Sequence, residues 1–306
     1  MWNQSLDNKL INIIPEERIF RDEPMYKHTT FRTGGPVKRF VSVAKESEII
    51  ALTQLCEQEN VDYYLVGNGS NLLVSDKGID GLCIELGSSF KNISFQDGLI
   101  RATAGTLLSS VAREAYDRSL TGFEFAAGIP GSVGGAMVMN AGAYGGEMKD
   151  VVQSVRVYDK KNNQIITLNN DEMQFGYRTS AIKQKGYIVL SADFCLREGN
   201  AEDIKTQMNE LAHRRREKQP LEYPSAGSTF KRPVGFYAGK LIEDSNLKGY
   251  SVGGAQVSEK HAGFVINKNN AQAIDIYRLI REVQEQVYAD SGIGLETEVV
   301  MLGDFS

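Results

Sequence analysis

The sequence is poor in the residues that hold metals and disulfides. Its 306 residues include three cysteines (Cys56, Cys83 and Cys195) and three histidines, with no CxxC pair and no HExxH motif. This scarcity argues against a zinc site, a transition-metal centre and a disulfide framework. We therefore expect buried free thiols in a reducing cytoplasm.

Long apolar runs and a strong charge of one sign are also missing. No window approaches the run of about 18 apolar residues that would span a membrane. Charges of both signs interrupt the first residues of the chain, so we expect neither a signal peptide nor a membrane partner. The formal net charge of −5 disfavours a protein that binds nucleic acid by neutralising phosphates.

Glycine, by contrast, is abundant, with 30 residues in 306, where about 7% is usual. The first glycine-rich segment, GNGSN at 67–71, follows an apolar run and begins like GxGxxG, but Leu72 stands in place of the third glycine. A Rossmann site is therefore disfavoured, and no P-loop motif occurs. The segment is either a tight turn or a nest of backbone N–H groups for a diphosphate, with Ser70 and Asn71 as side-chain donors.

A second glycine-rich stretch runs from Gly128 to Gly146, as GIPGSVGGA followed after four residues by AGAYGG. Small side chains allow either close packing of a helix on a strand or close approach of backbone to a ligand. Two such stretches, with no side chains for metal or covalent chemistry beside them, suggest a large cofactor held mainly by backbone.

Short strands and helices alternate irregularly, which predicts an α+β fold with a boundary near residue 199. We expect helices at 47–58, 106–116 with Thr106 as N-cap, 203–218 and 271–290. We expect strands at 37–43, 63–66, 72–74, 82–86, 93–95, 99–104, 151–158, 164–168, 187–196 and 295–302, the pair around 161–163 forming a hairpin. Residues 1–24 are helical or irregular, and 223–233 form a loop.

A few polar residues stand in specific surroundings. Arg178 lies in GYRTS, Ser228 lies in a glycine-flanked loop, and Glu296 and Glu298 share one face of an expected strand because they are two residues apart. Each has a plain structural explanation: a surface arginine, a turn serine, a charged edge strand. The basic run 214–218 could offset a helix dipole or meet a phosphate.

Six segments, in this order, resemble the UDP-N-acetylenolpyruvoylglucosamine reductase family of the vanillyl-alcohol-oxidase/PCMH flavoprotein superfamily. They are GNGSNLLVSD (67–76), AAGIPGSVGGAMVMNAGAYG (126–145), FGYRTS (175–180), AGSTFKRP (226–233), GGAQVSEKHAGFVIN (253–267) and LETEV (295–299). The resemblance runs from about Thr29 to Leu302. The compact segment 234–252 is similar to the second type of the family, which lacks a mobile loop with a substrate-binding tyrosine.

The resemblance implies an N-terminal lead-in (1–29), a PCMH-type FAD-binding domain of two α+β subdomains (30–199) and a smaller α+β substrate-binding domain with a C-terminal catalytic strand (200–306). FAD is expected to be noncovalent, because Ser70 and Asn71 stand where covalent members of the superfamily carry a histidine. The implied cofactor-binding residues are Gly67, Asn68, Gly69, Ser70, Asn71, Gly105, Gly128, Ile129, Pro130, Ser132, Val133, Gly134, Asn140 and Gly142.

The resemblance also implies the reaction. NADPH reduces FAD, and reduced FAD then reduces UDP-N-acetyl-3-O-(1-carboxyvinyl)glucosamine to UDP-N-acetylmuramate for peptidoglycan synthesis. The implied catalytic residues are Arg178, Ser228 as proton donor, and Glu298. The implied substrate-binding residues are Tyr177, Lys218, Gly227 and Lys231. Three positions depart from the family's pattern: Arg232, His261 and Val300 stand where a substrate-contacting asparagine, a glutamine and an arginine are found.

Two other readings stay open on the residues alone. The chain could be an FAD-dependent alcohol or sugar oxidase of the same superfamily, although it lacks the covalent histidine. It could also be a nonenzymatic nucleotide-sugar sensor, which would be colourless. We expect a cytoplasmic monomer that binds a UDP-sugar.

Overall fold

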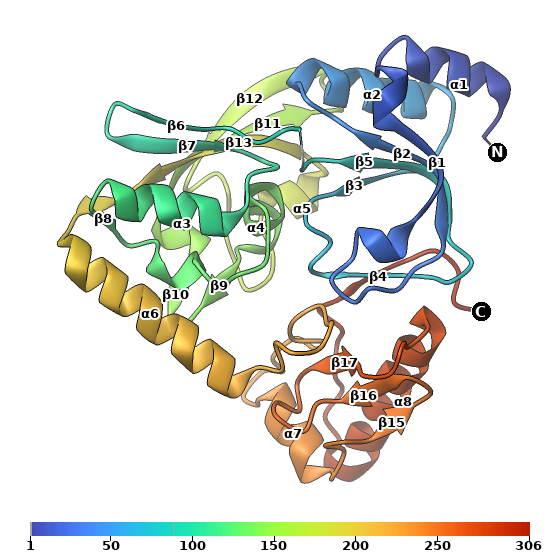
Figure 1. Cartoon of the computed structure of the whole chain (residues 1–306), viewed down its shortest axis with the longest axis vertical. Coiled ribbons are helices and arrows are strands. Elements are labelled where there is room, and N and C mark those ends of the chain that lie inside the picture. The colour runs from blue at the N-terminus through green and yellow to red at the C-terminus, as the bar shows by residue number, and fades with distance from the viewer. Residues whose placement is uncertain (1, 88) are drawn as a thin grey trace. The chain divides into compact units, whose positions relative to one another are not determined.

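The computed structural model describes residues 2–87 and 89–306, so residue 1 of the expected lead-in lies outside the described residues (Figure 1). The chain forms two compact units, each built from separate stretches of sequence. The first comprises the residues up to Phe20, Arg39–Asn68 and Gly81–Arg215, and the second comprises Arg21–Lys38, Gly69–Asp80 and Arg216–Ser306.

Helices and strands are distributed over the whole chain. The helices are α1 (Gln4–Ile11), α2 (Glu46–Gln58), α3 (Leu108–Asp117), α4 (Val133–Met139), α5 (Ala181–Lys185), α6 (Ala201–Lys218), α7 (Ala238–Asp244) and α8 (Ala273–Ser291). The strands up to the middle of the chain are β1 (Ile19–Pro24), β2 (Pro36–Ser42), β3 (Tyr63–Val66), β4 (Leu72–Val74), β5 (Ile79–Glu85), β6 (Ile93–Gln96), β7 (Leu99–Thr103), β8 (Leu120–Thr121), β9 (Gly142–Ala143) and β10 (Gly146–Glu147). The remaining strands are β11 (Val152–Asp159), β12 (Gln164–Asn169), β13 (Ile188–Cys195), β14 (Arg197–Glu198), β15 (Ser251–Val252), β16 (Ala255–Val257), β17 (Val265–Asn267) and β18 (Val300–Leu302).

The largest sheet belongs to the first unit and has the order β12-β11-β13-β7-β6, antiparallel throughout. Strand β13 lies at its centre, and seven of its eight residues are buried. Helices α3 and α4 pack against strands of this sheet (Figure 1). The buried residues Val133 and Met137 of α4 therefore join the same hydrophobic core as Val155 and Leu190.

A second sheet has the order β1-β2-β5-β3, in which β3 runs parallel to β5. Helix α2 contributes Ile49, Leu52 and Cys56 to the hydrophobic core of the first unit, as their helical spacing predicts. Strand β3 ends at Val66, and the first glycine-rich segment follows it directly.

The second unit is organised around α8, which packs on the small sheet β15-β16-β17. The buried stripe Ile276, Ile280, Val283 and Val287 of α8 forms its core with neighbouring apolar residues. The carboxylate of Asp76 accepts hydrogen bonds from the backbone N–H groups of the first two helical residues at 2.9 Å. Asp76 closes the GNGSNLLVSD segment, so that segment also caps the helix on which this core is built.

Most expected elements are confirmed, including the mixed α+β layout, the β11–β12 hairpin and helix α8. Three expectations are wrong. Helix α3 has Leu107 rather than Thr106 at its N-cap, and the Thr106 hydroxyl instead donates to the carbonyl of Asn92. The last regular strand begins at Val300, not at residue 295. Cys195 is exposed, because it ends the core strand β13, whereas Cys56 and Cys83 are buried.

Elements that the sequence did not indicate include β1 within the lead-in, α4 within the second glycine-rich stretch, α5, α7 within 234–252, and the short strands β15, β16 and β17. Among the described helices, none is long and apolar enough to cross a membrane.

Candidate functional site

In the first unit, the two glycine-rich stretches lie against each other. A Cβ atom on Gly67 would come within 2.2 Å of the Ser132 hydroxyl oxygen. The side-chain amide of Asn68 donates a 2.8 Å hydrogen bond to the carbonyl of Pro130. The contact therefore depends on the missing side chain at Gly67 and on the amide at Asn68.

Gly105 is packed as closely against its neighbours in the first unit as Gly67 is. A Cβ there would lie 2.3 Å from the carbonyl oxygen of Phe90, so only glycine fits. The preceding residue, Ala104, accepts a hydrogen bond from the N–H of Gly134 at 2.8 Å. The structure thus brings together Gly67, Asn68, Gly105 and the 128–134 segment, including Ile129 and Val133, in one closely packed region of the first unit, in which Gly105, Val133 and Gly134 are buried.

Arg178 is held on a tight turn next to the C-terminal end of α4. Its φ is +55°, and Gly176 and Thr179 pair across the turn. The side-chain amide of Asn140, which ends α4 in the left-handed conformation, donates to the carbonyl of Gly176 at 3.2 Å. The Ser180 hydroxyl donates to the carbonyl of Val138 at 3.0 Å. Helix α4 therefore fixes both sides of the turn.

Tyr177, on the same turn, is half exposed, and the Arg178 guanidinium lies 5.2 Å from the centre of its ring. Gly142 lies in β9, where a Cβ would come within 2.7 Å of the carbonyl of Gly146. The turn that carries Arg178 and the expected cofactor residues Asn140 and Gly142 thus belong to one local structure of the first unit.

The second half of the first glycine-rich segment belongs to the second unit. Gly69 has a φ of +60°, and a Cβ there would lie 1.9 Å from the carbonyl of His28. Its own carbonyl accepts a hydrogen bond from the N–H of Thr30 at 3.2 Å. Ser70 and Asn71 follow and are half-buried. Thr30 Oγ1 is buried and has no hydrogen-bond partner among the described residues.

Asn71 is tied to the segment of the expected catalytic glutamate. Its side-chain amide donates to the carbonyl of Glu298 at 3.0 Å, and its own carbonyl accepts from the N–H of Val300 at 2.9 Å. Directly after these two hydrogen bonds, the two segments pair in parallel as strands β4 and β18. The position of Glu298 is therefore set by the first glycine-rich segment.

Ser228 and Glu298 lie on directly paired segments of the second unit. The N–H of Glu298 donates to the carbonyl of Thr229 at 2.8 Å, and Phe230 bridges Thr297. Gly227 has a φ of +76°, which turns the chain before Ser228. The Ser228 hydroxyl donates to the carbonyl of Phe230 at 3.2 Å. The loop thus presents a half-buried hydroxyl next to the strand-like segment of Glu298.

The two neighbouring glutamates differ in their surroundings. Glu296 is exposed and forms a 2.8 Å ion pair with Lys231, and the hydrogen bond from Lys231 holds the pKa of Glu296 below its usual value. Glu298 is half-buried. The expectation that both lie on a regular strand is wrong for 295–299, where a single bridge replaces a ladder.

The other expected substrate residues and the divergent positions also lie in the second unit. Lys218 ends α6 and is exposed. The Arg232 guanidinium lies 4.1 Å from the ring centre of Tyr237. His261 is half-buried, accepts a hydrogen bond from the N–H of Gly263, and has its pKa lowered by burial. Val300 is exposed at the start of β18.

Sequence reasoning did not single out Arg215 from the basic run at the end of α6. A Cβ on Gly128 would lie 3.2 Å from the Arg215 side chain, which places that side chain against the second glycine-rich stretch. Burial lowers the pKa of Arg215, and a guanidinium in a protein stays charged. The helical spacing of 214–218 could have indicated that one arginine faces inward, but not which surface it meets.

The first unit also holds a cavity of about 420 Å³. Val61, Tyr63 and Leu65 line it from alternate positions along the β3 segment, and Val138 lines it from α4. The other lining residues are Asp62, Lys160, Ile182, Lys183, Gly186, Tyr187 and Ile188. Strand β3 leads from this cavity to Gly67, so the cavity lies along the strand that precedes the first glycine-rich segment.

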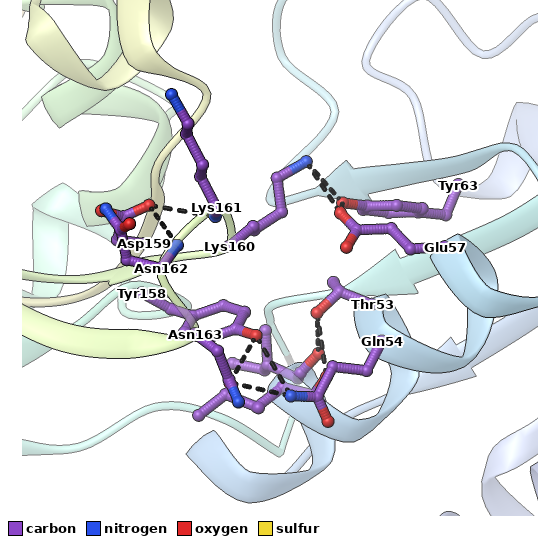
Figure 2. Close-up of polar contacts among 12 residues, drawn as sticks. Thr53, Gln54, Glu57, Tyr63, Tyr158, Asp159, Lys160, Lys161, Asn162 and Asn163 are labelled. Atoms are coloured by element: carbon purple, nitrogen blue, oxygen red, sulfur yellow. Dashed lines mark hydrogen bonds and ion pairs between the residues drawn. The ribbon is translucent and has the colours of Figure 1, made fainter.

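A polar cluster lies at the Lys160 side of the cavity (Figure 2). The Lys160 ammonium donates to the Tyr63 hydroxyl at 2.7 Å and lies 3.5 Å from the Glu57 carboxylate. Burial alone would lower the pKa of Lys160, but the contacts with Tyr63 and Glu57 outweigh it and raise that pKa. Burial also raises the pKa of Tyr63. Lys160 is therefore a firmly charged group beside an aromatic ring.

Comparisons with known proteins agree with this architecture. Residues 37–169 match the family model of an FAD binding domain, and residues 219–302 match that of the C-terminal domain of UDP-N-acetylenolpyruvoylglucosamine reductase. Two solved structures share the fold alone: a Phl p 4 variant described as a glucose oxidase and wild-type Phl p 4.0202, described as a glucose dehydrogenase, with TM-scores of 0.51 and identities of 15% and 14%. The protein is thus an FAD-dependent oxidoreductase with a PCMH-type fold, and the expected fold class is confirmed.

Full-length relatives define the family. A UDP-N-acetylenolpyruvoylglucosamine reductase of Caldanaerobacter subterraneus subsp. tengcongensis is 52% identical over 98% of both chains. One of Clostridioides difficile is 50% identical over 99% of this chain and 100% of that protein. The crystal structure of the Thermus caldophilus enzyme matches with a TM-score of 0.80 and 36% identity, covering 94% of this chain and 99% of that one. The chain belongs to the UDP-N-acetylenolpyruvoylglucosamine reductase family.

The residues present fit an FAD cofactor. In the first unit, a Cβ on Gly67 or Gly105 would collide with the Ser132 hydroxyl or the Phe90 carbonyl, so glycine lets the backbone of these segments approach closely, as in the FAD binding domain whose family model covers them. In the second unit, the Thr30 hydroxyl beside Gly69 is a buried donor with no hydrogen-bond partner among the described residues.

Proposed function

We propose that this chain reduces UDP-N-acetylenolpyruvoylglucosamine to UDP-N-acetylmuramate, a peptidoglycan precursor, with NADPH as the electron donor. The observation that carries the proposal is the pairing of Thr229 with Glu298, which sets the Ser228 loop beside a glutamate in a full-length member of this family. Bound FAD supplies the two-electron chemistry that carries hydride from NADPH to the terminal vinyl carbon of the substrate.

The side chains of the protein then stabilise the developing charge and supply the proton. When hydride adds to the vinyl group, negative charge develops on the adjacent carbon and spreads into the carboxylate. We assign Arg178 to the carboxylate oxygens, and Glu298 to a hydrogen bond that its carboxyl group, when protonated, donates to stabilise the same charge. Ser228 gives its proton to the carbon. A serine hydroxyl is a weak acid, but a carbanion-like centre is a strong base.

Binding roles follow from charge and backbone exposure. Lys218 carries positive charge for the diphosphate of the nucleotide sugar, and Tyr177, Gly227 and Lys231 are assigned to substrate binding as well. The cofactor is assigned to Gly67, Asn68, Gly69, Ser70 and Asn71, to Gly105, to Gly128, Ile129, Pro130, Ser132, Val133 and Gly134, and to Asn140 and Gly142. The FAD-binding domain is taken as 30–199 and the substrate-binding domain as 200–306, in a monomeric cytoplasmic enzyme.

The cavity of the first unit is assigned to the adenosine half of FAD. Strand β3 rises by about 3.3 Å per residue, so its cavity-lining residues Leu65 and Tyr63 lie about 7 and about 13 Å along the strand from Gly67. Its aromatic and aliphatic lining with a few polar groups suits a purine nucleoside.

The test is a pair of half-reactions followed by the flavin spectrum. Under anaerobic conditions, NADPH should bleach the flavin absorbance, and UDP-N-acetylenolpyruvoylglucosamine should restore it within the enzyme's turnover time. A colourless protein would contradict the proposal. So would a reduced protein that regains its colour with air but not with the substrate, since that behaviour belongs to an oxidase.

A further inference from the structure

Lys160 is one of two cations that line the cavity of the first unit among the described residues, the other being Lys183. It lies at the turn of the β11–β12 hairpin, whereas Tyr63 comes from β3 and Glu57 from helix α2. The ammonium group therefore sits where three elements meet at the cavity (Figure 2).

The hairpin turn that carries Lys160 is fixed in place. The side-chain amide of Gln54 in α2 donates to Asn163 at 2.8 Å, and Asp159 accepts a 3.0 Å hydrogen bond from the N–H of Lys161. The backbone and the ammonium group of Lys160 are both held, so its side chain is already ordered before a ligand binds. A ligand that contacts it therefore costs less side-chain conformational entropy than one that contacts a mobile lysine.

The ammonium group has donor capacity left for a ligand. A lysine carries three N–H donors, and the contacts with Tyr63 and Glu57 engage two of them. The third can serve an acceptor in the cavity. An adenosine phosphate offers such acceptors as ring nitrogens, ribose hydroxyls and phosphate oxygens, while the flavin and ribityl half of FAD is assigned elsewhere.

We propose that Lys160, held by Tyr63 and Glu57, is a specificity-determining contact for the adenosine half of the cofactor and favours FAD over FMN. This inference rests on the proposed function, because it takes the cavity as the adenosine site. FMN lacks the adenosine half, so Lys160 contributes to the binding of FAD and not to that of FMN.

The experiment compares dissociation constants of FAD and FMN for the flavin-free full-length protein, followed by flavin fluorescence. Lys160→Met should weaken FAD binding about tenfold, the effect of one lost hydrogen bond to a charged group, and leave FMN binding within about twofold. Lys161→Met, which removes the same charge from the next position, should change neither constant. Glu57→Gln, which keeps Lys160 but weakens its ion pair, should have a smaller effect on FAD than Lys160→Met.

The ratio of the two constants makes the test decisive even if the variant is less stable, because an unfolded fraction weakens both flavins equally. Equal losses for FAD and FMN, or no loss for either, would overturn the role of Lys160. If the wild-type protein binds FAD and catalyses the reaction, but the Lys160→Met variant keeps the same preference for FAD over FMN, only the inference about Lys160 is refuted. A wild-type protein that binds no FAD refutes the proposed function.

Discussion

The side-chain amide of Asn140 donates a hydrogen bond to the backbone carbonyl of Gly176, 3.2 Å away. Asn140 is buried and has a φ of +44°, and its amide also contacts Glu147 at 2.8 Å. Through this residue, the end of α4 positions the turn on which Arg178 is carried. A residue expected to bind cofactor thus also holds the guanidinium assigned to the substrate carboxylate.

This arrangement predicts different results for two substitutions of Asn140. Asn140→Gly accepts the left-handed backbone but loses the amide, so we expect kcat/KM per bound flavin to fall about tenfold or more because Arg178 is less well placed. Asn140→Ala should lose the same activity and, in addition, about 1–2 kcal/mol of unfolding free energy from the positive φ. Urea unfolding and steady-state kinetics measure the two effects. Wild-type kcat/KM in Asn140→Gly would contradict the positioning role.

Ser228→Ala separates the two half-reactions. Reduction of the flavin by NADPH should proceed as in the wild type, while reoxidation by UDP-N-acetylenolpyruvoylglucosamine should slow by about 10²–10⁴-fold, the usual contribution of a general acid. The hydroxyl makes a single 3.2 Å hydrogen bond to the carbonyl of Phe230, so little stability should be lost. Stopped-flow absorbance of the flavin records both steps. Equal slowing of both would rule out a proton donor at this position.

Gly67→Ala should destabilise the first unit, because the new methyl would lie 2.2 Å from the Ser132 oxygen. We expect a loss of about 1–3 kcal/mol in the flavin-free protein, the usual cost of overpacking. The double variant Gly67→Ala with Ser132→Ala should recover much of it, since the nearest remaining atom is then the Ser132 Cβ position at 3.3 Å. Gly135→Ala, whose nearest neighbour is 3.7 Å away, serves as the control. A double variant no more stable than Gly67→Ala would show that the clash is not the cause.

His261 predicts a pH dependence of stability. Burial lowers its pKa in the folded protein below the usual value, which is about 6.5. As the pH falls below that value, the unfolded chain binds a proton that the folded chain does not, so the unfolding free energy decreases. His261→Gln should flatten this decrease in urea unfolding curves recorded between pH 8 and pH 5. The exposed His213→Gln is the matched control, and an identical slope in wild type and His261→Gln would refute the assignment.

The sequence predicted best those features that are periodic and local. The spacing of Ile274, Tyr277, Ile280, Val283 and Val287 predicts helix α8, and its end at Gly292 is confirmed by a φ of +71°. The buried face includes the last three of these residues, together with Ile276 and Leu279, whereas Ile274 and Tyr277 are half-buried. The helix α4 was not predicted, because Gly134 and Gly135 lower helical propensity, and tertiary packing against Ala104 overrides it.

The site was predictable as a set of segments but not as a set of contacts. Order and spacing along the chain indicated the glycine-rich stretches, whereas the packing of Arg215 against Gly128 and the contact of Lys160 with Tyr63, 97 residues away, depend on the tertiary fold. Local patterns carry no information on such pairs, because their partners are chosen by packing.

The pairing of β4 with β18 has a consequence for the order of folding. Asn71 and Glu298 are joined by a hydrogen bond across 227 residues, and β18 directly follows Glu298 and Val299 in the sequence. A ribosome therefore has to add the long intervening stretch and β18 itself before the second half of the GNGSN segment can acquire its partners. Synthesis of β18, rather than of the glycine-rich stretches, becomes the step at which a nascent chain can first hold its cofactor loop in the native form.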